Sequence, residues 1–214
     1  MPENSKRNRF NEIATVWDES PRRIQTANAV FKAILNDVPL AKEMNILDFG
    51  CGTGLVAIPI QPYVNSVTAV DNSAGMLNVL REKIENRKIK NIQTVLINDN
   101  TVSLPDEKFD LIMSSLTLHH IHDYQNLLSK MFHLLNPGAY ICIADLEKEE
   151  GDFHDENTEA VHHGFDPEIL KENLTEIGYQ SITYKRIYTI TKETKEGKLK
   201  KFPLFLIIAR NPLT

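Results

Sequence analysis

The stretch Asn45–Gly54, with the sequence NILDFGCGTG, constrains the fold of this chain more than any other. A short apolar strand runs directly into glycines at alternate positions, Gly50, Gly52 and Gly54, and a helical pattern follows. Glycine tolerates positive φ in a tight turn and lets the backbone approach a ligand with no Cβ in the way. The first N–H groups of a helix also lack partners within that helix. The stretch therefore predicts a ligand-binding turn between a strand and a helix, with a plain tight connection as the competing interpretation.

Short β-rich runs alternate with helical patterns along the rest of the chain. This alternation is typical of a parallel sheet covered by helices on both faces. The runs are nearly continuous in apolar residues, as fully buried parallel strands are. The expected parallel strands are Asn45–Phe49, Ser66–Asp71, Ile92–Asn98, Phe109–Thr117 and Tyr140–Leu146.

Capping residues indicate where the helices begin and end. Ser20 and Asp166 each precede a proline, the pattern of an N-cap followed by the first helical residue. Gly178 is placed to close the last helix. The expected helices are one beginning at Ser20-Pro21, Ser73–Ile89, Asp123–Leu135 with a stop at Asn136–Gly138, and one from Asp166-Pro167 to Gly178.

The pattern changes near the C-terminus. Ser181–Lys192 and Phe202–Arg210 are both strand-like, and a Lys/Glu/Gly turn joins them without a helix, so we expect them to pair as antiparallel strands. The predicted fold class is α/β: a doubly wound, Rossmann-like, seven-stranded mixed sheet with a C-terminal antiparallel hairpin. Residues 1–214 are expected to form a single domain, which includes residues 1–36 as an N-terminal helical cap segment.

Composition narrows the classes of partner. The net charge of −5 gives no general attraction to phosphate backbones, so no nucleic-acid partner is expected. Two cysteines are too few for a disulfide framework, and they fit a reducing compartment. The first residues carry no apolar leader, and the longest apolar run, Pro203–Ala209, is too short for a membrane span. We expect a cytoplasmic protein with no membrane partner, and the oligomeric state stays open.

Polar side chains follow the second and third expected strands. Asp71 lies roughly twenty residues beyond the glycines, where a carboxylate is placed to accept the hydroxyls of a ribose. Asp99 and Asn100 follow the third strand and are placed to accept a hydrogen bond from an adenine amino group. A helix cap for Asp71 and a plain turn for residues 98–100 are the alternatives. Met76 is either a contact to the nucleoside or core filling.

The glycine spacing separates two classes of nucleotide ligand. A dinucleotide turn has the pattern G-x-G-x-x-G, whereas this turn reads G-x-G-x-G. Asp48, two residues before the first glycine, would repel a pyrophosphate and suits a cationic amino group. The turn therefore favours the methionine moiety of an adenosyl cofactor over a nicotinamide dinucleotide.

The segments LDFGCGTG, VDNSAGM, IND and FDLIMSSLTLHHI resemble class I S-adenosylmethionine-dependent methyltransferases, in the order and spacing of that family. The resemblance runs from about residue 10 to the end, and it is nearest to small-molecule methyltransferases of the kind found in quinone biosynthesis. It implies S-adenosylmethionine as the cofactor. The implied cofactor-binding residues are Asp48, Gly50, Cys51, Gly52, Gly54, Asp71, Asn72, Met76, Asp99, Asn100 and Leu116.

Histidines are the candidate catalytic residues. His119, His120 and His122 follow the fourth strand, and His154, His162 and His163 lie between the fifth strand and the last helix. Of these six, His119, His120 and His163 are the expected catalytic residues. Histidine suits a general base because its ordinary pKa is near neutrality. A purely pocket-shaping role for the His119–His120 pair is the alternative. The spacing HHxH has no strong metal-ligand signature, so no metal site is predicted.

Two segments are candidate lids over the site. Glu147–Glu159 holds seven acids against one lysine, so it is either a solvated loop, a lid or a surface for cationic substrates. Phe10–Arg23 contains Trp17, the only tryptophan.

The resemblance implies methyl transfer to a small-molecule acceptor by in-line displacement. Ser114–Thr117 lacks the Pro-Pro-aromatic motif of amino-methylating DNA enzymes. The alternatives are a non-catalytic S-adenosylmethionine-binding regulator and a protein or RNA methyltransferase.

Overall fold

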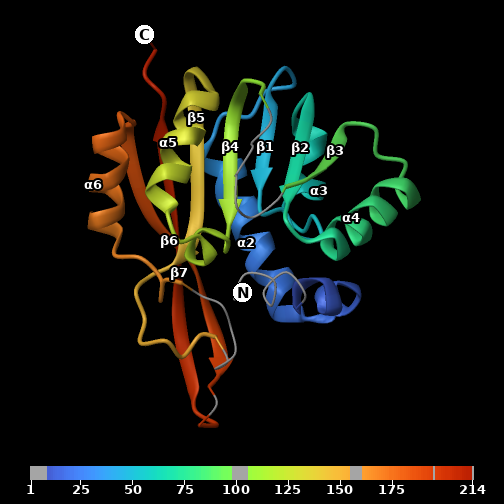
Figure 1. Cartoon of the computed structure of the whole chain (residues 1–214), viewed down its shortest axis with the longest axis vertical. Helices are drawn as coiled ribbons and strands as arrows, with labels where there is room; N and C mark the ends of the chain where they lie inside the picture. The colour runs from blue at the N-terminus through green and yellow to red at the C-terminus, as the bar shows by residue number, and fades with distance from the viewer. Residues whose placement is uncertain (1–8, 98–105, 155–160, 195, 214) are drawn as a thin grey trace.

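A central seven-stranded sheet organises the chain (Figure 1). The computed structural model describes residues 9–97, 106–154, 161–194 and 196–213. The strand order is β3-β2-β1-β4-β5-β7-β6. The strands are β1 Asn45–Phe49, β2 Ser66–Asp71, β3 Ile92–Leu96, β4 Phe109–Ser115, β5 Leu135–Leu146, β6 Gln180–Glu193 and β7 Leu199–Arg210.

The direction of pairing changes once across the sheet. Strands β3, β2, β1, β4 and β5 pair in parallel, whereas β7 pairs antiparallel with both β5 and β6. The C-terminal hairpin therefore inserts its second strand beside β5. The predicted fold class, a mixed doubly wound sheet ending in an antiparallel hairpin, is confirmed.

Helices cover both faces of this sheet. They are α2 Pro21–Asp37, α3 Ala57–Ile60, α4 Ala74–Asn86, α5 Tyr124–Leu134 and α6 Pro167–Ile177. Apolar residues of α2, α3 and α4 form one buried cluster, and those of α5 and α6 form another. Neighbouring β1 residues point to opposite clusters, since Ile46 belongs to the first and Leu47 to the second. No described helix combines the length and the apolar character that crossing a membrane requires.

The helices begin where the predicted N-caps place them, although the Ser20 side chain makes no capping hydrogen bond to α2. Asp166 accepts hydrogen bonds from the backbone N–H groups of the first turn of α6, and Gly178 ends that helix at φ +116°. Ser73 caps α4 by accepting a hydrogen bond from the Met76 N–H at 3.2 Å. Such caps can be predicted from the sequence, because each one bonds to unpaired backbone groups only a few residues away.

Helix α5 ends at Leu134, close to the predicted stop at Asn136–Gly138, but β5 begins at Leu135 and not at the expected Tyr140. The Gly138 N–H donates to the carbonyls of Asn211 and Pro212, and the Asn211 N–H donates to Ala139. Pairing with the chain's own C-terminal segment therefore extends the strand through residues whose local preference is for a turn.

The order of strands creates a crevice at one edge of the sheet. From β1 the chain proceeds outward through β2 to β3, then crosses back so that β4 lies on the other side of β1. Ligands of open parallel sheets bind where the strand order reverses, outside the carboxyl ends of the strands. The glycine turn after β1 and the residues after β4 both lie at that edge.

Candidate functional site

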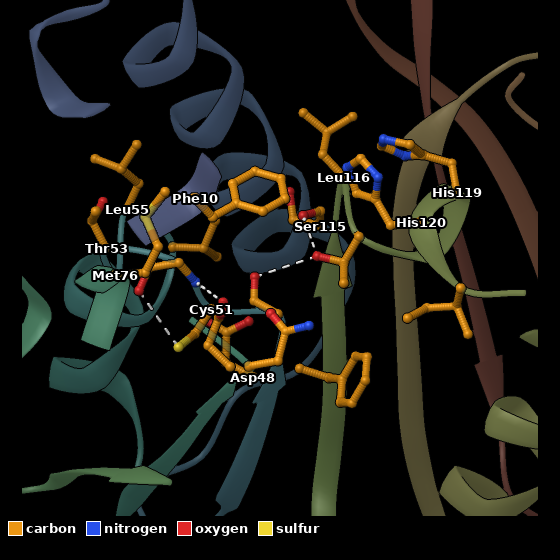
Figure 2. A pocket seen from close by; sticks show the side chains of 18 of the residues that line it. Phe10, Asp48, Cys51, Thr53, Leu55, Met76, Ser115, Leu116, His119 and His120 are labelled. Atoms are coloured by element: carbon orange, nitrogen blue, oxygen red, sulfur yellow. Dashed lines mark hydrogen bonds between the residues drawn. The ribbon is translucent and has the colours of Figure 1, made fainter. Parts of the chain in front are cut away.

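A cavity of about 580 Å³ lies at the carboxyl ends of the central strands (Figure 2). The predicted site residues that line it are Asp48, Gly50, Cys51, Gly52, Asp71, Asn72, Met76, Leu116, His119 and His120. Gly54 and His163 are not among the lining residues. Asp99 and Asn100 lie outside the described residues.

The glycines of the turn serve different purposes. Gly50 has φ +73°, and a Cβ there would stand 2.2 Å from Thr117 Oγ1, so the turn packs tightly against the end of β4. Gly52 has φ +52°, and a Cβ there would meet no atom within 4 Å. Gly54 packs against Leu80 of α4 and supports the turn from below the cavity. Gly52 is therefore the glycine whose open side is available to a ligand.

Asp71 joins the glycine turn to the start of α4. Its Oδ2 accepts a hydrogen bond from the Gly52 N–H at 2.8 Å, and its Oδ1 accepts one from the Ser73 N–H at 2.8 Å. A carboxylate oxygen has room for a second donor. Asp71 can thus clamp the turn and still accept hydroxyl groups from a ligand in the cavity.

Asp48 supplies a buried carboxylate beside the same turn. Its side chain is 2% exposed, and among the described residues nothing donates a hydrogen bond to its Oδ2. Burial, reinforced by the charge of Asp71, raises the pKa of Asp48 to about 8. A buried acceptor without a donor is costly, so this position fits a cationic amino group that would both donate to Asp48 and favour its ionised form.

The turn after β4 carries backbone strain at the cavity wall. Leu116 has φ +52°, a left-handed conformation that costs a non-glycine residue free energy. The Leu116 N–H donates to the Ala144 carbonyl, and the Thr117 hydroxyl lies 3.3 Å from the Gly50 carbonyl. These contacts hold the turn in place and end β4 at Ser115, two residues earlier than expected.

His119 is fixed by a buried carboxylate at the other end of the cavity. Its Nδ1 lies 2.6 Å from Oδ1 of Asp145, and its backbone N–H donates to Oδ2 of the same residue at 3.3 Å. His119 is 1% exposed and Asp145 is fully buried. A carboxylate accepts only, so Nδ1 carries the proton and Nε2 offers a lone pair. Within the described structure this Nε2 is buried and has no hydrogen-bond partner.

Two more imidazoles surround His119. Its ring centroid lies 4.1 Å from that of His120 and 4.9 Å from that of His154, and the last two are 5.3 Å apart. Figure 2 shows the rings of His119 and His120 side by side next to Leu116. Burial, together with the nearby charge of Lys192, lowers the pKa of His154 to about 3. The imidazole of His154 is therefore neutral at physiological pH.

Neither Asp145 nor His154 is in the predicted site. Asp145 stands within the apolar run YICIADL, and a carboxylate in a buried strand is a signal that the sequence does contain. His154 has no such local signal, because its distance from His119 along the chain hides the contact.

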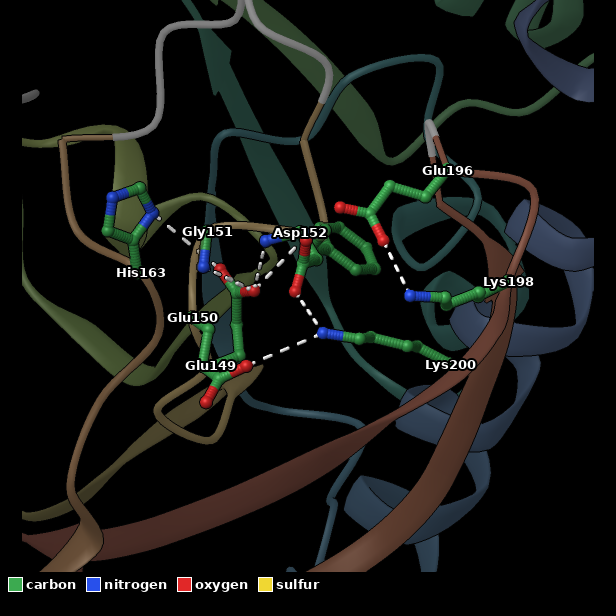
Figure 3. A network of polar contacts seen from close by, with 9 residues as sticks. Glu149, Glu150, Gly151, Asp152, His163, Glu196, Lys198 and Lys200 are labelled. Carbon is green, nitrogen blue, oxygen red and sulfur yellow. Dashed lines mark hydrogen bonds and ion pairs between the residues drawn. The ribbon is translucent and has the colours of Figure 1, made fainter.

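The described part of the acidic stretch, residues 147–154, includes a hydrogen-bonded turn. Oε2 of Glu149 accepts hydrogen bonds from the N–H groups of Gly151, Asp152 and Phe153. Lys200 pairs with acids of this turn (Figure 3). The turn thereby presents Phe153 and His154 to the cavity.

His163 lies on the outer side of that turn. Its side chain is 60% exposed, and its Nδ1 lies 3.6 Å from Oε1 of Glu149 (Figure 3). The structure thus brings His119 and His120 together and leaves His163 away from them.

The N-terminal segment, residues 9–19, covers one side of the cavity. Residues 9–13 are helical, and a 3-10 helix, η1 Ala14–Glu19, follows. Oδ1 of Asn11 accepts hydrogen bonds from the Ser73 hydroxyl and the Gly75 N–H, both at 2.8 Å. Asp18 accepts a hydrogen bond from the Thr53 hydroxyl at 2.6 Å. The segment is tied to the glycine turn and to α4, which places Phe10, Ile13 and Trp17 on the cavity wall.

Basic side chains contribute to the same cavity. The lining includes Arg9, Arg22, Arg23, Lys130 and Lys192. The guanidinium of Arg23 lies 3.8 Å from the centroid of the Trp17 ring, a cation–π contact that orients it. The net charge of the chain is negative, so these cations give the cavity a local electrostatic character unlike that of the whole protein.

Comparison with known proteins finds that part of the chain is similar to methyltransferases. Residues 47–143 match the family model described as a methyltransferase domain. An uncharacterized methyltransferase of Schizosaccharomyces pombe is 35% identical over 142 residues, which cover 59% of this chain and 50% of the relative. A demethylmenaquinone methyltransferase of Listeria welshimeri is 32% identical over 108 residues, covering 49% of this chain and 45% of the relative. The chain spans about half the length of these curated relatives.

The fold is also similar to that of a solved methyltransferase structure. A crystal structure described as a SAM-dependent methyltransferase from Aquifex aeolicus superimposes with a TM-score of 0.66 at 22% identity. The match covers 96% of this chain and 98% of that one. The likeness therefore extends over the whole architecture, including the C-terminal hairpin.

Proposed function

We propose that this chain carries a class I S-adenosylmethionine-dependent methyltransferase domain and that it transfers a methyl group to a small-molecule acceptor. S-adenosylmethionine is the cofactor of this family, as the sequence predicts. One observation carries the proposal: a single cavity joins the glycine turn, with Asp48 and Asp71, to the imidazoles of His119 and His120. Cofactor and acceptor can therefore meet inside one cavity.

The glycine-turn end would bind the cofactor. Gly52 leaves room for close approach, and Asp71 stands at the end of β2, where a ribose is bound in folds of this kind. The unpartnered oxygen of Asp48 suits the cationic amino group of the methionine moiety. Met76, which is 2% exposed and lines the cavity, would pack against the nucleoside.

The imidazole end would bind the acceptor. S-adenosylmethionine supplies, when bound, an electrophilic methyl group on a sulfonium. The chain's task is to hold the acceptor atom about 3–3.5 Å from that carbon, in line with the leaving sulfur, and to exclude water. His119, oriented by Asp145, and His120 are our candidate catalytic residues because their rings face this end.

A small acceptor fits the enclosure better than a macromolecule. Phe10 and Trp17 of the N-terminal segment line the cavity from above, and their segment is tied to the rest of the domain. The basic lining favours an acceptor with an acidic or anionic group. The Listeria relative is named for a quinone substrate, which supports including phenolic and quinol compounds among the acceptors to be tested.

Calorimetric titration tests the cofactor site. The purified chain is titrated in parallel with S-adenosylmethionine, S-adenosylhomocysteine and NADH. We expect micromolar binding of the two adenosyl ligands and none of NADH. If neither adenosyl ligand binds, the proposal is wrong.

Turnover separates the proposal from its alternatives. Formation of S-adenosylhomocysteine is followed with a panel of small phenols, quinols and carboxylates, and in parallel with protein extract and total RNA. Acceleration by a small compound supports the proposal. Binding without turnover on any acceptor indicates a regulator, and turnover confined to protein or RNA indicates a macromolecular substrate.

A further inference from the structure

Three histidines from two distant segments converge on one point of the cavity. His119 and His120 follow β4, whereas His154 comes from the acidic turn after β5. One ring nitrogen from each can be chosen so that all three lie within 4.8 Å of one another. The sequence predicts no metal site because HHxH alone has no ligand spacing, and the third histidine joins the pair only in the folded chain.

Two of these imidazoles present nitrogens that the fold itself does not use. Within the described residues, Nε2 of His119 and Nε2 of His154 are both buried and lack a hydrogen-bond partner. A native structure seldom leaves such atoms unpaired, and a bound ion is one of the standard reasons for finding them. The unpaired nitrogens indicate that a ligand with an affinity for imidazole lone pairs belongs between the rings.

Asp145 gives His119 the second contact that metal-binding histidines have. Metal-ligating imidazoles almost always donate their other N–H to a carboxylate or carbonyl, which fixes the tautomer and aims the ligating nitrogen. Here Nδ1 of His119 lies 2.6 Å from Oδ1 of the fully buried Asp145. Asp145 is itself held by the Leu146 N–H at 2.7 Å, so the orientation of the ring is firmly set.

We propose that His119, His120 and His154 bind one divalent transition-metal ion of the zinc type, with a fourth coordination position that opens into the cavity. Three neutral imidazoles with an open position are a known ligand set for catalytic zinc, at about 2.0–2.1 Å from each nitrogen. The three ring nitrogens lie within 4.8 Å of one another, so the rings need to move only slightly closer together to bind one ion at this distance. Arg9 and Lys192 line the same end, so the fourth ligand that fits best is an anionic oxygen of the acceptor.

This inference rests on the proposed function for the identity of that fourth ligand, but the metal site itself does not depend on it. It changes the role of His119. Nε2 has a single lone pair, so His119 would act as a metal ligand. Coordination to the ion would acidify an acceptor hydroxyl, which would release its proton to solvent.

The test measures metal binding without any need for turnover. Untagged protein is stripped with a chelator, the chelator is removed, and Co²⁺ and Zn²⁺ are titrated by calorimetry and by the visible absorption of Co²⁺. We expect one ion per chain and the intense absorption bands of a four-coordinate cobalt site. Absence of both would overturn the metal site.

Variants assign the site to the three histidines. His154→Ala and His120→Ala should each weaken Co²⁺ binding by more than about tenfold, and Asp145→Asn by about 10–100-fold, as loss of an outer-shell partner does. His122→Ala is the matched control, because His122 lines the cavity without belonging to the cluster. Equal loss in His122→Ala, or unchanged affinity in His154→Ala, would refute the assignment.

Titration with S-adenosylmethionine on the same samples separates the two proposals. Cofactor binding without metal binding removes only the metal site. Metal binding without cofactor binding removes the proposed function and leaves the ion site standing.

Discussion

At the residue scale, the site depends on a few residues whose local conformation or environment is energetically unfavourable. Asp48 is a buried carboxylate with an unpartnered oxygen, and Leu116 adopts a left-handed backbone without being glycine. Such features persist where the surrounding structure over-determines them, and they gather at ligand sites. Each makes a prediction that concerns one side chain.

Alanine substitutions at Gly52 and Gly50 should distinguish an effect on cofactor binding from an effect on folding. Alanine in the left-handed region costs about 1–2 kcal/mol at either position. At Gly52 the added Cβ meets free space, so Gly52→Ala should fold and lose S-adenosylmethionine affinity by at least about tenfold, as blocked backbone approach implies. Gly50→Ala should lower the melting temperature much further, because its Cβ collides with Thr117. Melting curves and calorimetry check both, and normal binding in Gly52→Ala would remove the turn from the site.

Asp48 should make the unliganded protein less stable as pH rises. Its pKa is raised in the fold to about 8, whereas an unfolded aspartate titrates near its ordinary value of 3.8. Its contribution is therefore fully present below that lower value, and it is lost as the pH rises through the folded pKa. The stability difference between wild type and Asp48→Asn should fall by up to about 1.4 kcal/mol per pH unit and level off above about pH 8.

Melting curves of the two proteins, recorded from about pH 5 to about pH 9, check this prediction. A constant difference between wild type and Asp48→Asn across the range would show that the carboxyl does not change its charge there.

At the scale of elements, the N-terminal segment acts as a cover held by side-chain ties. Asn11 accepts hydrogen bonds at the start of α4, and Asp18 accepts one from Thr53 of the glycine turn. Asp18 also pairs with Lys83. The ties connect the cover to the cofactor end of the cavity, so closing the cover and ordering the glycine turn are expected to be coupled.

Removing two ties should open this cover without unfolding the sheet. Asn11→Ala with Asp18→Ala removes three hydrogen bonds, each worth about 1 kcal/mol, and the ion pair of Asp18 with Lys83. We expect faster proteolysis within residues 9–19, weaker S-adenosylmethionine binding by about tenfold or more, and a fall in melting temperature of up to about 10 °C. Glu19→Ala, an exposed neighbour in η1, is the control. Unchanged affinity in the double variant would mean that the cover does not contribute to cofactor binding.

At the scale of the whole molecule, the site joins both halves of the sheet. The glycine turn follows β1, Asp71 ends β2, Leu116 follows β4 and Asp145 lies in β5. A ligand that touches all of these elements binds only the folded chain. Binding must therefore stabilise the entire domain by mass action.

Cofactor should raise the unfolding temperature of the complete chain. At a concentration of about 100 times Kd the gain is about 2.7 kcal/mol, which corresponds to about 5–10 °C for a chain of this size. S-adenosylhomocysteine should have a similar effect. Asp71→Asn places an amide N–H₂ where an acceptor is needed and should reduce the shift by more than half. An equal shift in this variant would contradict the role of Asp71.

The sequence by itself determined the features that local physics controls. Apolar continuity located β1 and β2 to the residue, and caps such as Ser73 and Gly178 located helix ends, because each depends on neighbours within a turn or two. The alternate glycines with Asp48 and Asp71 likewise indicated a cofactor turn of the adenosyl type.

Tertiary structure alone decided what the far end of the cavity contains. The pairing of His119 with Asp145, and the approach of His154 to both, join segments that no periodicity relates. In the same way the start of β5 depends on residues near the C-terminus, not on the turn preference of Asn136–Gly138. Such contacts form because distant segments bury their side chains and hydrogen-bond to one another in the packed chain. A local sequence pattern contains no information about which segments meet.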